Sequence, residues 1–413
     1  MTDRRPVVDF DHHAPDFDAR VAYGRLRRTC PVAWTEAHGG FWVVSRHEDV
    51  STVARQDATF SSGRDENGHG GIVIPEWNTE TSIPIEMDPP ESVPYRRMLN
   101  ALLHPRAVEH MKPMIADVTT EVIDVFIEAG RCDLINDLTS PVAALVVALW
   151  IGFPRQDWKP LAQAVHDVFG SAPGTERAAR GKAGMQWMVE EVHSLVHERR
   201  ADPRDDVVSF LCAQQIEGRP LGDDEVVSMV KLLVGGGMDT TTSLTGQTLV
   251  HLCSHTEHRK WLRQDPSVLV SATEEFLRVF APSQSMGRTA TADVELGQCA
   301  IRKGDRVLLP WVAANFDEGV FDEPDQVVLD RPGNRHTSFG LGSHRCVGSH
   351  LARAMFQEMI RQVLERIPDY RVLTDRMVPY ASHGNQTGWD SLPAVFTPGP
   401  RRGAGATSAP PAP

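Results

Sequence analysis

The sequence predicts a mainly α protein with a minor amount of β structure. Apolar residues recur with helical spacing through most of the stretch between residues 95 and 255, and spacing typical of short strands is confined to the segments on either side. The longest helical pattern is Asp223–His255. The chain has 413 residues, of which 41% are hydrophobic and 23% charged, so it can bury a sizeable core.

The first 90 residues are expected to form two helices around a hairpin, followed by a long loop. In chain order these are a helix over Phe17–Arg28, strands over Val32–Glu36 and Phe41–Ser45, a helix from His47, and a loop over Gly63–Pro90. The hairpin turn is placed at two consecutive glycines, and the loop is rich in Gly, Pro, Asn and Glu. A loop of that length inside a compact domain is usually functional or disordered.

The centre of the chain is expected to be helical, and strands return near its end. The predicted helices are Tyr95–Leu103, Val108–Ala129, Pro141–Gly152, Gln156–Phe169, Ala178–Ala201 and Asp205–Gln215. Short strands are predicted near Val294–Gln298, Arg306–Pro310 and Pro379–Pro398. Residues 1–397 are expected to form one domain. Residues 398–413 are rich in Pro, Gly and Ala and are expected to be a disordered tail.

Charge, cysteine spacing and the N-terminal sequence disfavour several classes of protein. The net charge of -13, with no dense basic run, disfavours a nucleic-acid binder. The six cysteines are scattered without a Cys-x-x-Cys pair, which disfavours a zinc site or a disulfide framework and fits a reducing compartment. The first ten residues contain no long apolar run, so neither a signal peptide nor a membrane anchor is expected, and the predicted location is cytoplasmic.

Cys346 lies in the glycine-punctuated stretch Phe339–Gly348, which leads into a helical pattern at His350. Glycines at 340, 342 and 348 allow tight turns and a close approach of the backbone to a flat group. A thiolate near a helix N-terminus is a soft ligand suited to iron, and Cys thiolate is the axial ligand in one class of haem enzyme. A buried free cysteine is the alternative interpretation, and for a bare Cys it is the commoner outcome.

The second unusual feature is three consecutive glycines, Gly235–Gly237, inside the longest helical pattern. Each costs about 1 kcal/mol relative to alanine in a helix. The following Asp239 and Thr240 can compete for nearby carbonyls and bend the helix. The alternative is a close helix–helix crossing with a surface aspartate. Either way, the sequence predicts a local defect at this point of the helix.

The pattern Phe-Gly-x-Gly-x-His-x-Cys-x-Gly over Phe339–Gly348 resembles the haem-binding loop of the cytochrome P-450 family, in its soluble bacterial type. The resemblance runs from about residue 15 to residue 397. It implies the cytochrome P-450 fold, with a long central helix over the haem and small β-sheets. It also implies a haem b whose iron is bound by Cys346, in a loop shaped by Phe339, Gly340 and Gly348.

Gly237-Met-Asp239-Thr240 matches the family's Gly-x-Asp/Glu-Thr signature in the central helix. The resemblance implies that Asp239 relays protons from solvent and that Thr240 hydrogen-bonds the bound dioxygen. An ionisable group beside a hydroxyl is chemically suited to delivering protons. These two residues are the catalytic candidates.

Arginine suits the two carboxylates of haem, because its guanidinium forms bidentate, charge-assisted hydrogen bonds. The resemblance implies propionate contacts from Arg96, Arg288 and His344, although Ser92 stands where the family often has histidine. It also implies a structural role for one further set of residues. These are Glu275 and Arg278, three apart on one helix, and Arg331 in a later segment.

The implied activity is that of a monooxygenase, which inserts one oxygen atom of O2 into a mostly apolar small molecule by hydroxylation or epoxidation. Electrons are expected from a separate ferredoxin and its reductase. The pocket-lining candidates are Leu232, Gly235, Gly236, Ser283, Met286, Thr387 and Trp389. We expect a terpenoid, steroid or polyketide-type natural product of secondary metabolism, free or bound to a carrier. Two alternatives remain: a peroxide-driven haem-thiolate enzyme and a non-enzymatic haem sensor.

Overall fold

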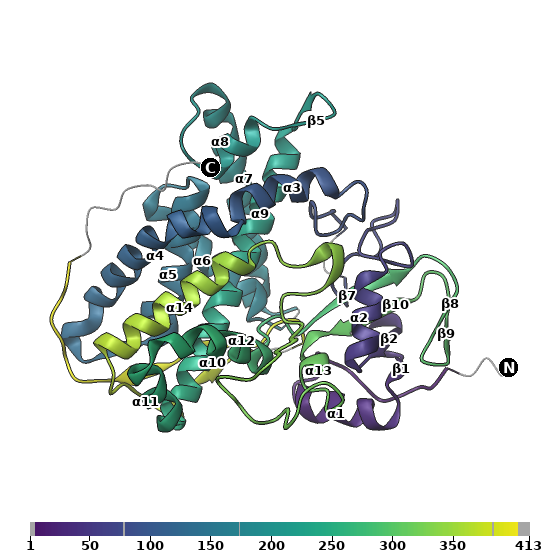
Figure 1. Cartoon of the computed structure of the whole chain (residues 1–413). Coiled ribbons are helices and arrows are strands. Elements are labelled where there is room, and N and C mark those ends of the chain that lie inside the picture. Colours follow the sequence, from purple (N-terminus) through teal and green to yellow (C-terminus); the bar gives the residue numbers. More distant parts are fainter. Residues whose placement is uncertain (1–4, 77–78, 173, 382–383, 404–413) are drawn as a thin grey trace. The chain divides into compact units, whose positions relative to one another are not determined.

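The computed structural model describes residues 5–76, 79–172, 174–381 and 384–403. Contacts along the chain divide it into two compact units (Figure 1). Unit 1 comprises Met1–Tyr95, Glu274–Cys346 and Ser382–Thr387, and unit 2 comprises Arg96–Thr273, Val347–Ala381 and Gly388–Pro413. Helices predominate and the sheets are small, so the predicted fold class is confirmed.

Unit 1 begins with the predicted helix, hairpin and helix. They are α1 (Ala19–Thr29), β1 (Val32–Thr35), β2 (Phe41–Val44) and α2 (His47–Arg55). The predicted loop after them is also confirmed, since the described residues between 63 and 90 contain only an isolated β-bridge and no strand or helix. Residues 77 and 78 of this loop lie outside the described residues.

A five-stranded sheet in the order β1-β2-β10-β7-β3 forms the centre of unit 1. Its other strands are β3 (Phe60–Ser61), β7 (Ser285–Ala290) and β10 (Arg306–Pro310). Strand β10 pairs in parallel with β2 and antiparallel with β7. Strands β3 and β7 were not predicted, because neither has an alternating apolar pattern long enough to indicate a strand. The sheet therefore joins segments about 250 residues apart in sequence, and only the folded chain shows which strands are neighbours.

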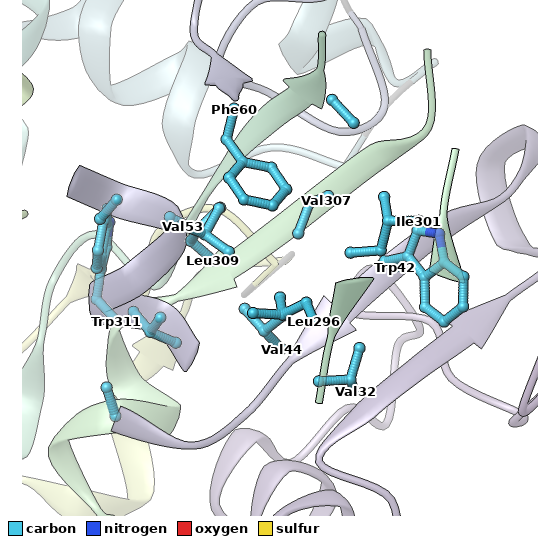
Figure 2. Packing of buried hydrophobic residues seen from close by; sticks show 14 of the residues in the cluster. Val32, Trp42, Val44, Val53, Phe60, Leu296, Ile301, Val307, Leu309 and Trp311 are labelled. Carbon is cyan, nitrogen blue, oxygen red and sulfur yellow. The ribbon is translucent and has the colours of Figure 1, made fainter. Parts of the chain in front are cut away.

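The sheet of unit 1 is buried on both faces. Alternate residues of a strand point to opposite faces, and in β2 Trp42 belongs to one apolar cluster while Val43 belongs to another. Figure 2 shows the first cluster, in which Leu309 of β10 lies near Val53 of α2. A short helix, α13 (Trp311–Asn315), follows β10, and a separate hairpin is formed by β8 (Val294–Leu296) and β9 (Cys299–Ile301).

Unit 2 is mainly helical. Its helices are α4 (Pro105–Phe126), α5 (Ser140–Ile151), α6 (Trp158–Phe169), α7 (Glu176–Ala201), α8 (Val207–Cys212), α9 (Asp223–Gly237), α10 (Asp239–Ser254), α11 (Thr256–Gln264) and α14 (Ser349–Arg366). Helices α3 (Val93–Leu103) and α12 (Leu269–Phe280) contain residues of both units. Helix α14 is bound to α4 by side chains: Gln362 donates to the Ala116 carbonyl at 2.9 Å, and Arg366 forms an ion pair with Asp124.

Three small sheets complete unit 2. Strands β11 (Arg371–Val372), β14 (Pro393–Val395) and β4 (Arg131–Asp133) form one, β12 (Val378–Pro379) pairs with β13 (Trp389–Ser391), and β5 (Gln215–Ile216) pairs with β6 (Arg219–Pro220). Strand β4 leads into a π-helical turn, η3 (Leu134–Thr139), and then α5. Within the described residues, Leu134–Ile151 is the one stretch long and apolar enough to cross a membrane, and 78% of it is buried inside the structure, as in a core helix.

The C-terminal segment predicted to be disordered starts at Pro398, and the structure describes it as far as Gly403. The Gly399 N–H donates to the Ile127 carbonyl at 3.1 Å, and the Gly403 N–H donates to the Asp124 carboxylate at 2.8 Å. These hydrogen bonds attach residues 398–403 to the C-terminal end of α4. The remainder of the predicted tail, residues 404–413, lies outside the described residues.

Candidate active site

The cysteine loop of unit 1 is held by backbone hydrogen bonds. The Cys346 N–H donates to the Phe339 carbonyl at 2.8 Å, and the Gly340 N–H donates to the Thr337 carbonyl at 2.7 Å. Gly340 and Gly342 have φ values of 67° and 71°, which side chains rarely adopt. A Cβ on Gly342 would also lie 2.5 Å from the Ala54 carbonyl oxygen. The loop therefore requires glycine at both positions.

Cys346 differs from the other cysteines in its exposure. All six cysteines lie in the described residues, and Cys346 alone is exposed. Burial raises the pKa of the thiol in Cys30, Cys132, Cys212 and Cys299, which keeps those side chains neutral. The predicted helix after the loop is α14, which begins at Ser349 with Gly348 as its N-cap. Cys346 is thus the thiol best placed to bind a metal from outside the chain.

Arg288 is a buried cation that forms no direct ion pair among the described residues of unit 1. It lies on β7 and its exposed fraction is 1%. Its guanidinium donates to the neighbouring Gly287 carbonyl at 2.8 Å, while its Nε has no hydrogen-bond partner in the described part of the chain. Burial lowers the pKa of Arg288 to about 10, and the nearby carboxylates of Asp88 and Asp57 only partly oppose this effect. A buried arginine in this state has hydrogen-bonding capacity for an anion.

His344 has a similar unsatisfied atom. Its Nε2 lies 3.0 Å from Ser62 Oγ and 3.5 Å from Asp88 Oδ1. Its Nδ1 is buried and has no hydrogen-bond partner among the described residues. Burial raises the pKa of Asp88, but hydrogen bonds from His344, Ser61 and Ser62 outweigh burial and hold it well below the usual range. Asp88 and Ser62 therefore fix the His344 ring and leave the second ring nitrogen available.

These unit 1 residues fit a haem. The exposed thiol of Cys346 can bind iron, and the unsatisfied nitrogens of Arg288 and His344 can bind carboxylate oxygens. Ser92, which replaces the family's usual histidine, has a buried hydroxyl without a partner in the described residues. Arg96, the remaining propionate candidate, is half-buried in α3 and belongs to unit 2.

The long helix of unit 2 is interrupted at the predicted position. Helix α9 ends at Gly237 and α10 begins at Asp239, with Met238 between them at φ −86° and ψ −65°. The Thr240 hydroxyl donates to the Gly236 carbonyl at 2.8 Å, so a side chain competes for the helical acceptor. A Cβ on Gly237 would lie 3.2 Å from Val147 of α5, whereas no atom lies within 4 Å of a Cβ on Gly235 or Gly236. Only the third glycine is explained by helix packing.

Asp239 is held in a buried polar cluster within unit 2. Its exposed fraction is 4%. The Tyr380 hydroxyl lies 2.8 Å from both carboxylate oxygens of Asp239, and His166 Nδ1 lies 3.0 Å from Oδ1. Burial together with the Asp239 carboxylate raises the pKa of Tyr380 well above 10, so the phenol stays protonated and donates. Asp239 is therefore not a surface aspartate, which disfavours the alternative of a helix–helix crossing with a surface aspartate.

The cluster continues from His166 through a series of alternating charges. His166 Nε2 lies 3.1 Å from Asp390 Oδ1, and Arg177 donates to both oxygens of Asp390 at 2.6 and 2.7 Å. Burial lowers the pKa of His166, but its hydrogen bonds to Asp239 and Asp390 outweigh burial and raise it to about 9. Arg177 also donates to Asp167 at 2.9 Å. At neutral pH His166 is therefore an imidazolium between two carboxylates.

The sequence did not indicate His166, Tyr380 or Asp390. They come from α6, from the residue after β12 and from β13, and no motif or spacing connects them. The only available signal was the presence of Asp239 in a helix that was expected to be mostly apolar, because a buried carboxylate needs partners. Which residues supply them depends on tertiary packing.

The pocket candidates fall into two groups. In unit 1, Ser283 forms a β-bridge with Gln386, and the Thr387 N–H donates to the Pro282 carbonyl at 3.1 Å. Met286 lies on β7 and packs against the first apolar cluster. In unit 2, Leu232, Gly235 and Gly236 lie on α9. Trp389 lies on β13, and its indole nitrogen is buried without a partner in the described residues.

Glu275, Arg278 and Arg331 form a buried ion cluster in unit 1. The Glu275–Arg278 pair is 2.8 Å apart with both side chains 0% exposed, and Arg331 Nε lies 3.0 Å from Glu275. Arg278 also donates to the carbonyls of Asn315, Pro324 and Gln326 at 2.8–2.9 Å. Because these carbonyls belong to the segment before the cysteine loop, the geometry fits a structural role.

The chain is similar to known proteins in sequence and in fold. The family model described as Cytochrome P450 (here P-450) matches residues 174–379. A steroid C26-monooxygenase of Mycobacterium tuberculosis is 32% identical to this chain, over 94% of it and 96% of the relative. Mycobacterium marinum cytochrome P-450 CYP268A2 in complex with pseudoionone is a similar solved structure, with 27% identity over 95% of this chain and 100% of that chain and a TM-score of 0.87. CYP109E1 from Bacillus megaterium in complex with testosterone is another, with 26% identity over 92% of this chain and 99% of that chain and a TM-score of 0.81.

Enzymes of this family use haem b, and the exposed Cys346 thiol and the unsatisfied nitrogens of Arg288 and His344 are groups in unit 1 that could hold it. The relative from M. tuberculosis exceeds 30% identity over nearly the whole length of both proteins. The chain therefore belongs to the cytochrome P-450 family and is a haem-dependent monooxygenase.

Proposed function

We propose that this enzyme inserts one oxygen atom of O2 into a steroid-type, mostly apolar molecule, using electrons from a separate ferredoxin and its reductase. Bound haem supplies the activation of dioxygen: a substrate C–H bond, O2, two electrons and two protons give a C–OH group and one water. Electrons come from the partner, but protons must pass through the protein. The observation that carries the proposal is the buried Asp239 beside Thr240 at the helix interruption.

Each candidate residue has a chemical task in this proposal. Cys346 binds the haem iron, and Arg288 and His344 bind the propionates through nitrogens that have no other partner among the described residues. Asp239 passes protons to the reaction, and the Thr240 hydroxyl donates a hydrogen bond to dioxygen. To do so, the hydroxyl must break its hydrogen bond to the Gly236 carbonyl. Phe339, Gly340 and Gly348 shape the cysteine loop.

The steroid class is supported by the relatives. The relative from M. tuberculosis is a steroid C26-monooxygenase, and CYP109E1 was solved with testosterone. The chain's own residues suit such a molecule. Gly235 and Gly236 have no atom within 4 Å of a Cβ position, so a bulky apolar group meets no side chain there. Ser283 and Thr387 offer hydroxyl groups for an oxygen-bearing substrate, and Met286 and Trp389 offer apolar surface.

The ferredoxin partner is supported by charge. Arg345, beside Cys346, is exposed, and the chain as a whole carries a net charge of -13. A basic side chain next to the iron ligand would attract an acidic electron carrier at short range, although the net negative charge of the chain repels it at larger distances. The proposal also places the enzyme in the cytoplasm, where reduced ferredoxin is available.

A spectral titration combined with turnover tests the proposal. The purified ferric protein is titrated with steroids, terpenoids and macrolides, and product is then measured with ferredoxin, reductase and NAD(P)H, or with hydrogen peroxide alone. We expect a low- to high-spin shift with steroids and a hydroxylated steroid only in the ferredoxin assay. Turnover with peroxide alone would instead support a peroxide-driven enzyme. A haem spectrum without any product would support a sensor.

Replacement of Cys346 by serine provides the matching control. Because a hydroxyl is a poor ligand for haem iron compared with a thiolate, the thiolate absorption spectrum should disappear. A retained thiolate spectrum would contradict the assignment of Cys346. Replacing the half-buried Cys299 by serine should leave the spectrum unchanged.

A further inference from the structure

We infer that His166 is a positioning and proton-holding residue for Asp239, so that Asp239, His166 and Asp390 form a carboxylate–imidazole–carboxylate series supplying protons to the oxygen reaction. The inference rests on the proposed function, because it assigns a source for the protons that Asp239 would deliver. All three residues lie within unit 2, as do Tyr380 and Arg177, which contact them.

The geometry connects the buried and more exposed ends of the cluster in two steps. His166 Nδ1 is 3.0 Å from Asp239 Oδ1, and His166 Nε2 is 3.1 Å from Asp390 Oδ1. The side chains of Asp239, His166 and Asp390 are 4%, 11% and 22% exposed, respectively. Exposure to solvent therefore increases steadily away from the helix interruption, as expected of a path along which protons enter from water.

Of the two neighbours of Asp239 described above, His166 is the one that can exchange a proton near neutral pH. Tyr380 keeps its proton because burial and the adjacent carboxylate raise its pKa well above 10. Arg177, which donates to Asp390 and to the His166 carbonyl, remains a fixed cation. An imidazolium can release the Nδ1 proton to Asp239 and regain one from water near the part-exposed Asp390. His166 then returns to its original protonation state.

The groups facing His166 come from four elements and are consistent with this role. Asp239 on α10 and Asp390 on β13 are carboxylates, Tyr380 lies after β12, and Arg177 lies on α7. Two anions against one nearby cation favour the charged form of His166. The ring is fixed at both nitrogens, so it also fixes the direction of the Asp239 carboxylate.

The test compares three substitutions in the haem-loaded enzyme with ferredoxin, reductase and testosterone as the probe. Asparagine at 166 keeps a hydrogen-bond donor near the Nδ1 position but cannot hold a proton. For His166→Asn we expect a several-fold fall in product per NAD(P)H, a matching rise in hydrogen peroxide and a larger solvent isotope effect. Asp239→Asn should give the same pattern. Asp167→Asn removes a buried carboxylate of the outer cluster, which pairs with Arg177 and Arg180, and this variant should keep the parent's product per NAD(P)H.

The outcomes separate the two proposals. If Asp239→Asn uncouples the reaction and His166→Asn does not, the role of His166 is refuted and the proposed function stands. If neither substitution uncouples it, the proton path through Asp239 itself is refuted. A second measurement needs no substrate: histidine NMR titration of the diamagnetic ferrous carbonyl form. We expect His166 to stay protonated through neutral pH in the parent protein and to titrate lower in Asp390→Asn. Titration near pH 6.5 in the parent would overturn the inference.

Discussion

At the scale of single residues, two arginines on neighbouring strands of unit 1 differ in how their hydrogen bonds are satisfied. Arg288 has an unpartnered Nε among the described residues, and burial lowers its pKa to about 10. Arg306 is half-buried, and it donates to Thr289 Oγ1 at 2.8 Å and to the Val73 carbonyl at 3.0 Å. Arg288 is thus prepared for an external anion, whereas Arg306 is already satisfied within the protein.

We therefore predict that Arg288→Met weakens haem binding. A hydrogen bond to a charged group is worth about 1.5–3 kcal/mol, so the haem dissociation constant should rise about 10- to 100-fold. Transfer of haem to an excess of apomyoglobin measures this directly. Arg306→Met is the matched control, and it should destabilise the fold without changing haem retention. Equal retention in both variants would contradict a propionate contact from Arg288.

His166 gives the protein a specific pH dependence. Its pKa is raised to about 9 in the folded protein, against about 6.5 in the unfolded chain. The folded state therefore holds a proton that the unfolded state releases between these values. The stabilisation is complete below about pH 6.5 and is lost as the pH rises through about 9.

Urea unfolding at pH 6 and at pH 9.5 should detect this loss. Relative to His166→Asn, the parent protein should lose up to about 3 kcal/mol of unfolding free energy over this interval. The comparison with the variant removes the contributions of other titrating groups. A constant difference between the two proteins at both pH values would show that His166 does not hold the proton.

At the scale of secondary structure, the interrupted helix α9–α10 contains a run of three glycines, although glycine has a low helix propensity. Gly235 and Gly236 face no atom within 4 Å of a Cβ position, while Gly237 is approached by Val147 at 3.2 Å. The three neighbouring glycines are therefore required for different reasons. Packing against α5 requires only Gly237.

We predict opposite responses to alanine at these positions. Gly236→Ala should stabilise the protein by up to about 1 kcal/mol, because alanine favours a helix and the site is open. Gly237→Ala should stabilise the protein less than Gly236→Ala does, or destabilise it. This difference in unfolding free energy should shrink when Val147 is also replaced by alanine. Denaturant unfolding of the four proteins measures the coupling. If Gly236 lines the proposed pocket, its alanine variant should also bind testosterone more weakly with an unchanged haem content.

At the scale of the whole molecule, the buried ion cluster of unit 1 connects α12 to the segment before the cysteine loop. Glu275 and Arg278 are both 0% exposed, and Arg278 donates to three backbone carbonyls in that segment. A buried pair contributes little net stability when intact, but loss of one partner leaves an unpaired buried charge. We therefore propose that the cluster maintains the conformation of the segment and takes no part in the chemistry.

Arg278→Met should accordingly destabilise the protein by about 3–5 kcal/mol. The surface pair Arg302–Asp293, with side chains 48% and 61% exposed, is the control, and Arg302→Ala should change stability by less than about 1 kcal/mol. The midpoint of urea unfolding, at constant m-value, reports both changes. Similar shifts in the two variants would contradict the structural role assigned to Glu275 and Arg278.

The sequence alone determined the helical class, the early hairpin, the helix after the cysteine loop and the position of the helix defect, because each depends on local patterns. Apolar periodicity, glycine content and capping act over a few residues. The motif at Cys346 was local for the same reason, since its glycines determine how ten consecutive residues turn.

Tertiary structure decided what no local pattern encodes. The pairing of β10 with β2 and the unpredicted strand β7 join distant segments. Asp239 meets His166 and Tyr380 from two distant parts of the chain, and the Nε of Arg288 is left without a partner among the described residues only because of how its surroundings fold. The physical reason is that burial and hydrogen-bond satisfaction depend on which surfaces meet, and that is a property of the packed chain rather than of any segment.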